Sequence, residues 1–157
     1  MAISSCTILD VHGKPLVLLA EDEANDRYMV ERAMRKHSID IDLRMVSDGE
    51  EAVQYLSAKG EFSDRKLNPL PRLIVLDIKM PRRSGLEVLE WIRQDAVCKL
   101  IPVVIMSSSE LPADVNRAYG LGVNAYLVKP AAFTGLVELF NSATDLFIHK
   151  AAHPQPA

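Results

Sequence analysis

Residues 73–81 read LIVLDIKMP, and they give the clearest indication of the fold. Its first four residues are uniformly apolar and too few for a helix. Such a run is typical of a central strand in a parallel sheet, which is covered on both faces. Asp77 follows directly, where the strand would end. We therefore expect a buried strand that brings one carboxylate to its carboxyl end.

Apolar runs of this kind recur along the chain, and stretches with helical periodicity separate them. The expected strands are 16–20, 41–45, 73–76, 103–106 and 125–128. The expected helices are 23–36, 47–56, 84–92, 114–121 and 133–147. This alternation predicts an α/β fold of the (βα)5 type, a doubly wound five-stranded parallel sheet with helices on both faces.

The composition sets limits on the class of protein. The 157 residues suit one domain, and 48% hydrophobic with 25% charged residues is ordinary for a globular chain. A net charge of −3 argues against a sequence-independent binder of nucleic acid. The longest apolar stretches reach about half a dozen residues, whereas a membrane span needs about 20. We expect no direct contact with nucleic acid or membrane.

The N-terminus lacks the positively charged start of a signal peptide, because acidic and polar residues interrupt its apolar run. The two cysteines, Cys6 and Cys98, fit no metal-binding spacing. We therefore expect a cytoplasmic protein with two reduced thiols.

Polar residues follow four of the expected strands, and open parallel sheets bind ligands at the carboxyl ends of their strands. Glu21 and Asp22 follow the first strand, Asp77 the third, Ser107 the fourth and Lys129 the fifth. Clustered carboxylates repel one another unless a cation intervenes, and hard oxygen donors favour Mg²⁺ or Mn²⁺. A phosphate oxygen typically completes such a site, and a lysine would pair with the same phosphate.

These residues stand in motifs that resemble the receiver domain of two-component response regulators. The motifs are VLLAEDE (17–23), LIVLDIKMP (73–81) with SG (84–85), PVVIMSSS (102–109) and NAYLVKP (124–130). The resemblance covers residues 15–148, which leaves 1–14 as an N-terminal extension and 149–157 as a disordered tail. It implies the flavodoxin-like receiver fold with strand order 2-1-3-4-5. The extra length at residues 60–71 further resembles stand-alone receivers that partner bacteriophytochrome-type kinases.

The resemblance also implies how the acidic residues act. Asp77 matches the phosphoacceptor, which takes a phosphoryl group from the phosphohistidine of a histidine kinase. Glu21 and Asp22 match the acidic pair that holds Mg²⁺, together with Asp77 and the backbone carbonyl of Lys79. The side chain of Lys79 occupies a variable position that, with Ser109, could alter the rate of dephosphorylation.

Three further positions match residues that respond to the phosphoryl group. Ser107 matches the switch hydroxyl that bonds a phosphoryl oxygen, and Lys129 matches the lysine that pairs with it. Tyr126 matches the aromatic residue whose ring turns inward as the hydroxyl moves. The Lys129–Pro130 bond matches one that is usually cis in the family.

Two other functions compete with a phosphoaccepting receiver. A Mg²⁺-dependent phosphatase that works through aspartyl phosphate would need a second acid two residues after its nucleophile, and this chain has Lys79 there. A pseudo-receiver that only binds partners is disfavoured because every site residue is present. We therefore expect a phosphoacceptor with slow autodephosphorylation rather than an enzyme.

About ten residues follow Phe147, too few for an output domain. The signal is thus expected to leave through a surface recognised by another protein, through a changed oligomer, or by transfer to another histidine. The last expected helix carries an apolar stripe wider than packing on one side of a sheet requires. Either this helix is deeply buried, or Leu139, Leu146 or Ile148 lies at an interface. The second alternative predicts a symmetric dimer through the last helix and strand 125–128.

Overall fold

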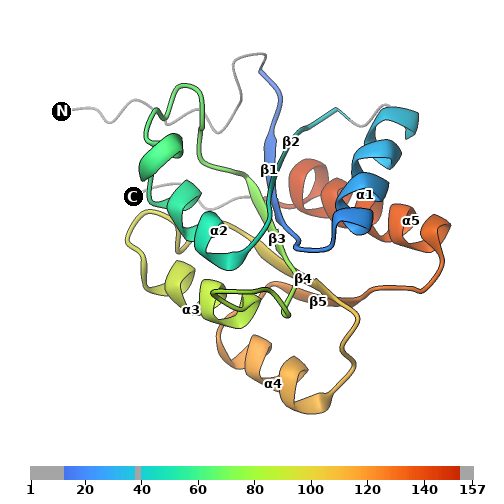
Figure 1. Ribbon diagram of the computed structural model, residues 1–157. Helices are drawn as coiled ribbons and strands as arrows, with labels where there is room; N and C mark the ends of the chain where they lie inside the picture. The colour runs from blue at the N-terminus through green and yellow to red at the C-terminus, as the bar shows by residue number, and fades with distance from the viewer. Residues whose placement is uncertain (1–12, 38–39, 153–157) are drawn as a thin grey trace.

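A five-stranded parallel sheet lies between two layers of helices in the computed structural model, which describes residues 13–37 and 40–152 (Figure 1). The strands are β1 (Leu16–Ala20), β2 (Asp42–Val46), β3 (Leu73–Leu76), β4 (Val103–Ser107) and β5 (Ala125–Val128). Their order is β2-β1-β3-β4-β5, and every pairing is parallel. The predicted fold class and strand order are confirmed.

Helices cover both faces of this sheet. They are α1 (Ala24–His37), α2 (Gly49–Leu56), α3 (Gly85–Gln94), α4 (Pro112–Gly120) and α5 (Phe133–Thr144). A 3₁₀ turn, η1 (Gly60–Phe62), follows α2, and a π-type turn, η2 (Asp145–Lys150), continues α5. Helices α1 and α5 lie on one face, and α2, α3 and α4 lie on the other (Figure 1). Among the described residues, no helix combines the length and apolar character needed to cross a membrane.

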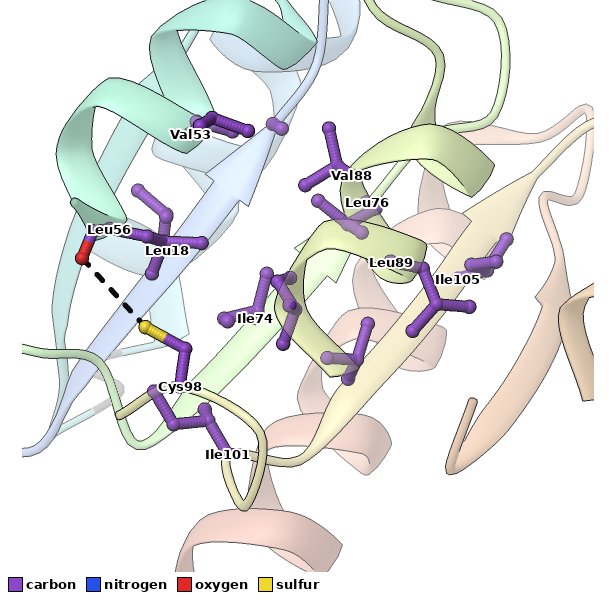
Figure 2. Close-up of a cluster of buried hydrophobic side chains, with 14 of the residues drawn as sticks. Leu18, Val53, Leu56, Ile74, Leu76, Val88, Leu89, Cys98, Ile101 and Ile105 are labelled. Atoms are coloured by element: carbon purple, nitrogen blue, oxygen red, sulfur yellow. Dashed lines mark hydrogen bonds between the residues drawn. The ribbon is translucent and has the colours of Figure 1, made fainter. Parts of the chain in front are cut away.

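Alternating side chains of the three central strands fill two separate cores. Leu18, Ile74 and Ile105 pack against α2 and α3 (Figure 2), whereas Val17 and Val75 pack on the side of α1 and α5. Successive strand residues point to opposite faces, so a strand covered on both faces must be apolar throughout. This explains the uniform burial of β1, β3 and β4.

Cys98 belongs to the first core. Its thiol lies 3.8 Å from the carbonyl oxygen of Leu56 (Figure 2). Burial, helped by the charge of Asp95, raises the pKa of the Cys98 thiol to about 12. The thiol therefore stays protonated and acts as a small apolar side chain. Cys6 lies outside the described residues.

The structure extends the last helix beyond the predicted end of the domain and separates the two alternatives for its apolar stripe. The helix continues through η2 to Lys150, two residues past the expected domain end. Of the rest of the expected tail, residues 151–152 are described and 153–157 lie outside the described residues. Ile148 is only 4% exposed, which fits the alternative of a deeply buried helix and removes this residue from the candidates for an interface. It lies four and eight residues after the buried Thr144 and Phe140, on the face that packs against the sheet. Leu146 is 52% exposed.

The extra segment at residues 60–71 packs against α2. Arg65 donates hydrogen bonds to the carbonyl oxygens of Tyr55 at 2.7 Å and Leu56 at 2.5 Å, which satisfies acceptors at the end of that helix. The Tyr55 hydroxyl in turn donates to the carbonyl oxygen of Pro69 at 2.8 Å. The insertion thus anchors the chain just before β3.

Two ion pairs join the loop after Asp77 to the start of α2. Arg82 Nε lies 3.2 Å from Asp48 Oδ2, and Arg83 Nε lies 3.2 Å from Glu50 Oε2. Asp48 also caps α2, because its Oδ1 accepts a hydrogen bond from the backbone N–H of Glu51 at 2.8 Å. The loop after β3 is therefore tied to the start of α2, the helix that follows β2 in the chain.

Gly85 lets α3 start directly against the backbone of Asp77. A Cβ atom at this position would lie 2.0 Å from the Asp77 carbonyl oxygen, far inside van der Waals contact. Ser84 caps the helix through a reciprocal pair of hydrogen bonds with Glu87. The SG pair in the sequence motif thus fixes where the helix meets the phosphoacceptor candidate.

Replacing Gly85 with alanine should lower the free energy of unfolding by about 1–3 kcal/mol, because backbone rather than a flexible side chain must move. Gly120→Ala is the matched control, since a Cβ there meets no atom within 4 Å. Alanine at this helical position should be neutral or slightly stabilising. Urea unfolding of both variants measures the difference, and equal stability would contradict the close approach at Gly85.

Candidate functional site

The sheet register brings the acidic residues of β1 and β3 together. Ala20 and Leu76, the last residues of the two strands, stand opposite each other. The next residues extend the ladder, because Asp77 N donates to Ala20 O at 3.1 Å and Glu21 N donates to Val46 O at 3.1 Å. Glu21 and Asp77 therefore leave adjacent strands at the same edge of the sheet.

Three carboxylates meet at this edge. One oxygen each of Glu21, Asp22 and Asp77 lie within 4.8 Å of one another. Glu21 and Asp77 are buried and Asp22 is half-buried, so the cluster is only partly open to solvent. Hard oxygen donors at this spacing fit Mg²⁺ or Mn²⁺. Lys79 lies in the loop two residues beyond Asp77, with its side chain exposed.

Lys129 places an ammonium group among these acids. Backbone pairing at the end of β5 positions it, since Lys129 N donates to Ser107 O at 2.8 Å. Its Nζ lies 2.5 Å from Glu21 Oε2, 3.0 Å from Asp77 Oδ2 and 3.1 Å from Asp26 Oδ2. The side chain of Lys129 is only 12% exposed. Its charge is therefore compensated within the pocket.

The electrostatics of the pocket favour a further cation. Burial raises the pKa of Glu21 to about 7, the negative charge of Asp77 adds to this effect, and Lys129 opposes it. Burial alone would lower the pKa of Lys129, but its hydrogen bond and ion pair with Glu21 and its ion pair with Asp77 raise it above its ordinary value. One ammonium group thus faces several carboxylates, and a divalent cation would offset the remaining negative charge.

A second network joins the hydroxyl residues beyond β4 to β5. Ser107 is buried at the end of β4, and its Oγ accepts a hydrogen bond from Ser109 N at 3.2 Å. The Tyr126 hydroxyl donates to the Ser109 carbonyl oxygen at 2.8 Å. The Ser109 hydroxyl donates to Asp114 Oδ2, in the first turn of α4, at 2.6 Å. These contacts link the pocket edge to α4.

The expectation of a cis bond between Lys129 and Pro130 is wrong. No peptide bond within residues 13–37 and 40–152 is cis, so this bond is trans. A trans bond before proline is favoured by about 0.5–1 kcal/mol in the absence of other constraints. The trans bond is compatible with every Lys129 contact described above.

Two residues that sequence reasoning did not single out contact the site. Asp26, in the first turn of α1, pairs with Lys129. Arg27 Nη1 donates to the backbone carbonyl oxygen of Glu21 at 2.7 Å and ties the same helix turn to the acidic loop. The available signal was an acid in the first helical turn, four residues after Asp22 of the acidic pair.

Comparisons with known proteins agree with this arrangement. The profile of the response regulator receiver domain matches residues 17–141. Response regulator Rcp1 of Synechocystis is 32% identical over 139 residues, which is 88% of this chain and 92% of that protein. Its Mn²⁺-bound crystal structure superposes with a TM-score of 0.80 over 90% of this chain and 99% of that chain, at 32% identity.

Two further solved structures are similar over most of the chain. The phosphorylated cyanobacterial phytochrome response regulator RcpA has a TM-score of 0.82 and 31% identity, with 90% of this chain and 99% of that chain covered. The bacteriophytochrome response regulator RtBRR has a TM-score of 0.72 and 35% identity, with 92% of this chain and 84% of that chain covered.

Replacing Asp22 with alanine should weaken Mg²⁺ or Mn²⁺ binding at least about tenfold, because it removes one of the three clustered carboxylates. Glu23→Gln is the matched control, since it removes the same charge from the exposed neighbouring residue. Titration calorimetry at neutral pH measures both affinities. An unchanged affinity of Asp22→Ala would show that the cation binds through other donors.

Proposed function

The chain belongs to the response regulator receiver family of two-component signalling, and we propose that it accepts a phosphoryl group from a histidine kinase on Asp77. The observation that carries this proposal is the ammonium group of Lys129, 3.0 Å from Asp77 Oδ2 in a pocket lined by carboxylates. A buried carboxylate beside a fixed cation is suited to meet a phosphoryl group, whose transfer depends on positioning and charge compensation.

In the proposed transfer, a carboxylate oxygen of Asp77 attacks phosphorus as the bond from phosphorus to the histidine nitrogen breaks. The imidazole leaves with the electron pair of that bond. Mg²⁺ bound by Glu21, Asp22 and Asp77 would supply a Lewis acid that lowers the repulsion between the two anions. Lys129 donates to a phosphoryl oxygen and offsets the charge that develops there. Asp77 Oδ1 already accepts a hydrogen bond from Ile78 N at 2.7 Å, which orients the carboxylate.

The output of this reaction starts at Ser107, whose hydroxyl we assign to a phosphoryl oxygen. A Ser107 that turns toward the phosphoryl group would give up its contact with Ser109 N. Ser109 is held by Tyr126 and Asp114, so this change is passed to β5 and α4. The receiving surface is therefore the side of the molecule formed by α4, β5 and α5.

We propose a phytochrome-type histidine kinase as the phosphodonor and a cytoplasmic site of action. The kinase assignment rests on the similarity to phytochrome response regulators, including RcpA and RtBRR. We further propose that Mg²⁺, or Mn²⁺ as bound in the Rcp1 structure, occupies the acidic cluster. The downstream partner is either a protein that binds the phosphorylated receiver or a histidine-containing phosphotransfer protein that takes the phosphoryl group from it.

The Asp77→Asn variant should gain no phosphoryl mass from a small phosphodonor in the presence of Mg²⁺, because an amide cannot accept the group. Wild type should gain one phosphoryl group by intact mass measurement. Asp64→Asn, which makes the same change in an exposed loop, should behave as wild type. Phosphorylation of Asp77→Asn at the wild-type rate would place the acceptor elsewhere.

Phosphorylation should strengthen self-association by about 1–3 kcal/mol, a usual allosteric coupling, through a dimer formed by β5 and α5. An open groove lined in part by Val128, Glu138 and Leu139 marks this surface. Leu146, seven residues after Leu139 in the continuation of the same helix, is exposed. Sedimentation with and without a beryllium fluoride mimic of the phosphoryl group measures the association.

Leu146→Asp should weaken that association, whereas Val97→Asp is a control at an exposed position in the loop before β4. A monomer in both states at high protein concentration would leave this surface to the kinase and to other proteins.

A further inference from the structure

We propose that Asp26 is a positioning residue for phosphoryl transfer, which holds the Lys129 ammonium group in place while Glu21 and Asp77 change partners. The inference rests on the proposed function and adds a residue to it. Its basis is the 3.1 Å contact between Asp26 Oδ2 and Lys129 Nζ.

The ammonium group of Lys129 has three N–H donors. Each finds a carboxylate in this structure, from Glu21, Asp77 and Asp26. The three acceptors come from three separate places in the chain, namely the loop after β1, the loop after β3 and the first turn of α1. Together they occupy all three donors of the ammonium group.

Two of these three acceptors have a second task. Glu21 and Asp77 belong to the cluster of carboxylates that can hold a divalent cation, and Asp77 is the proposed acceptor. Asp26 is not a member of that cluster. When the other two carboxylates turn to the cation and to the phosphoryl group, Asp26 is the acceptor whose bond to Lys129 needs no change.

The surroundings of Asp26 suit this role. It lies at the third position of α1, where the helix dipole stabilises a carboxylate. Arg27, the next residue, ties the same turn to the Glu21 carbonyl oxygen at 2.7 Å, so the helix start is fixed relative to the acidic loop. The Asp26 side chain is 32% exposed, against 12% for Lys129. Water thus lowers the cost of keeping this carboxylate charged while its partner is shielded.

A lysine held by an ion pair is better positioned to meet a phosphoryl group than an unrestrained one. A long lysine side chain loses considerable rotamer entropy when it is fixed, and Asp26 supplies that restraint before the phosphoryl group arrives. Asp26→Asn keeps the shape and removes the charge. We expect the maximal rate of phosphorylation by acetyl phosphate to fall about tenfold, with a smaller change in the donor concentration for half-maximal rate.

A double-mutant cycle separates positioning from a general structural effect. If Asp26 acts through Lys129, Asp26→Asn should have no further effect on the rate in a Lys129→Met background. Asp26→Glu should recover most of the wild-type rate. Glu31→Gln removes an exposed acid from the same helix, outside the pocket, and should leave the rate unchanged.

Intact mass measured over time, on the full chain with saturating Mg²⁺, gives each rate. An Asp26→Asn rate equal to wild type, or an equal loss with and without Lys129, overturns the inference while the proposed function stands. A wild-type protein that gains no phosphoryl mass overturns both. If Lys129→Met fails to fold, recovery by Asp26→Glu and the larger effect on maximal rate than on half-saturation decide the question, and absence of both overturns the inference.

Discussion

The contact of one ammonium group with three carboxylates is the interaction on which the site depends. Buried charges are costly unless each is paired, and Lys129 provides the pairing for Glu21 and Asp77. It also joins the end of β5 to the ends of β1 and β3, which are not its neighbours in the sheet. The same lysine therefore compensates the charge of the acids and sets the distance across the pocket.

The rest of the fold holds the loops around that contact. Gly85 allows α3 to start against the backbone of Asp77, and the ion pair of Arg82 with Asp48 fixes the intervening loop to α2. On the other face, Arg27 holds the start of α1 against the Glu21 carbonyl. Helices from both layers thus restrain the acidic pocket, and its geometry is largely built before any ligand binds.

The sequence was sufficient to predict the sheet and the acidic residues. A short run such as LIVL, apolar throughout, fits a strand covered on both faces, and parallel strands bring the residues that follow them to one edge of the sheet. Asp26 was not predicted, since its contact depends on the angle at which α1 leaves β1. The sequence left the burial of Ile148 open for a related reason, because a wide apolar stripe does not reveal how far the helix continues along the sheet. The cis bond was carried over from the family pattern, and this chain has a trans bond there.

The Lys129 contacts also bear on when the protein can first act during its synthesis. Lys129 pairs with acids 108, 103 and 52 residues earlier in the chain. A ribosome makes residues 21–77 well before residue 129, so a growing chain carries its acids without this counter-charge. The pocket is completed only when β5 joins the edge of β4. A chain competent to accept a phosphoryl group by this arrangement has therefore already finished assembling its sheet.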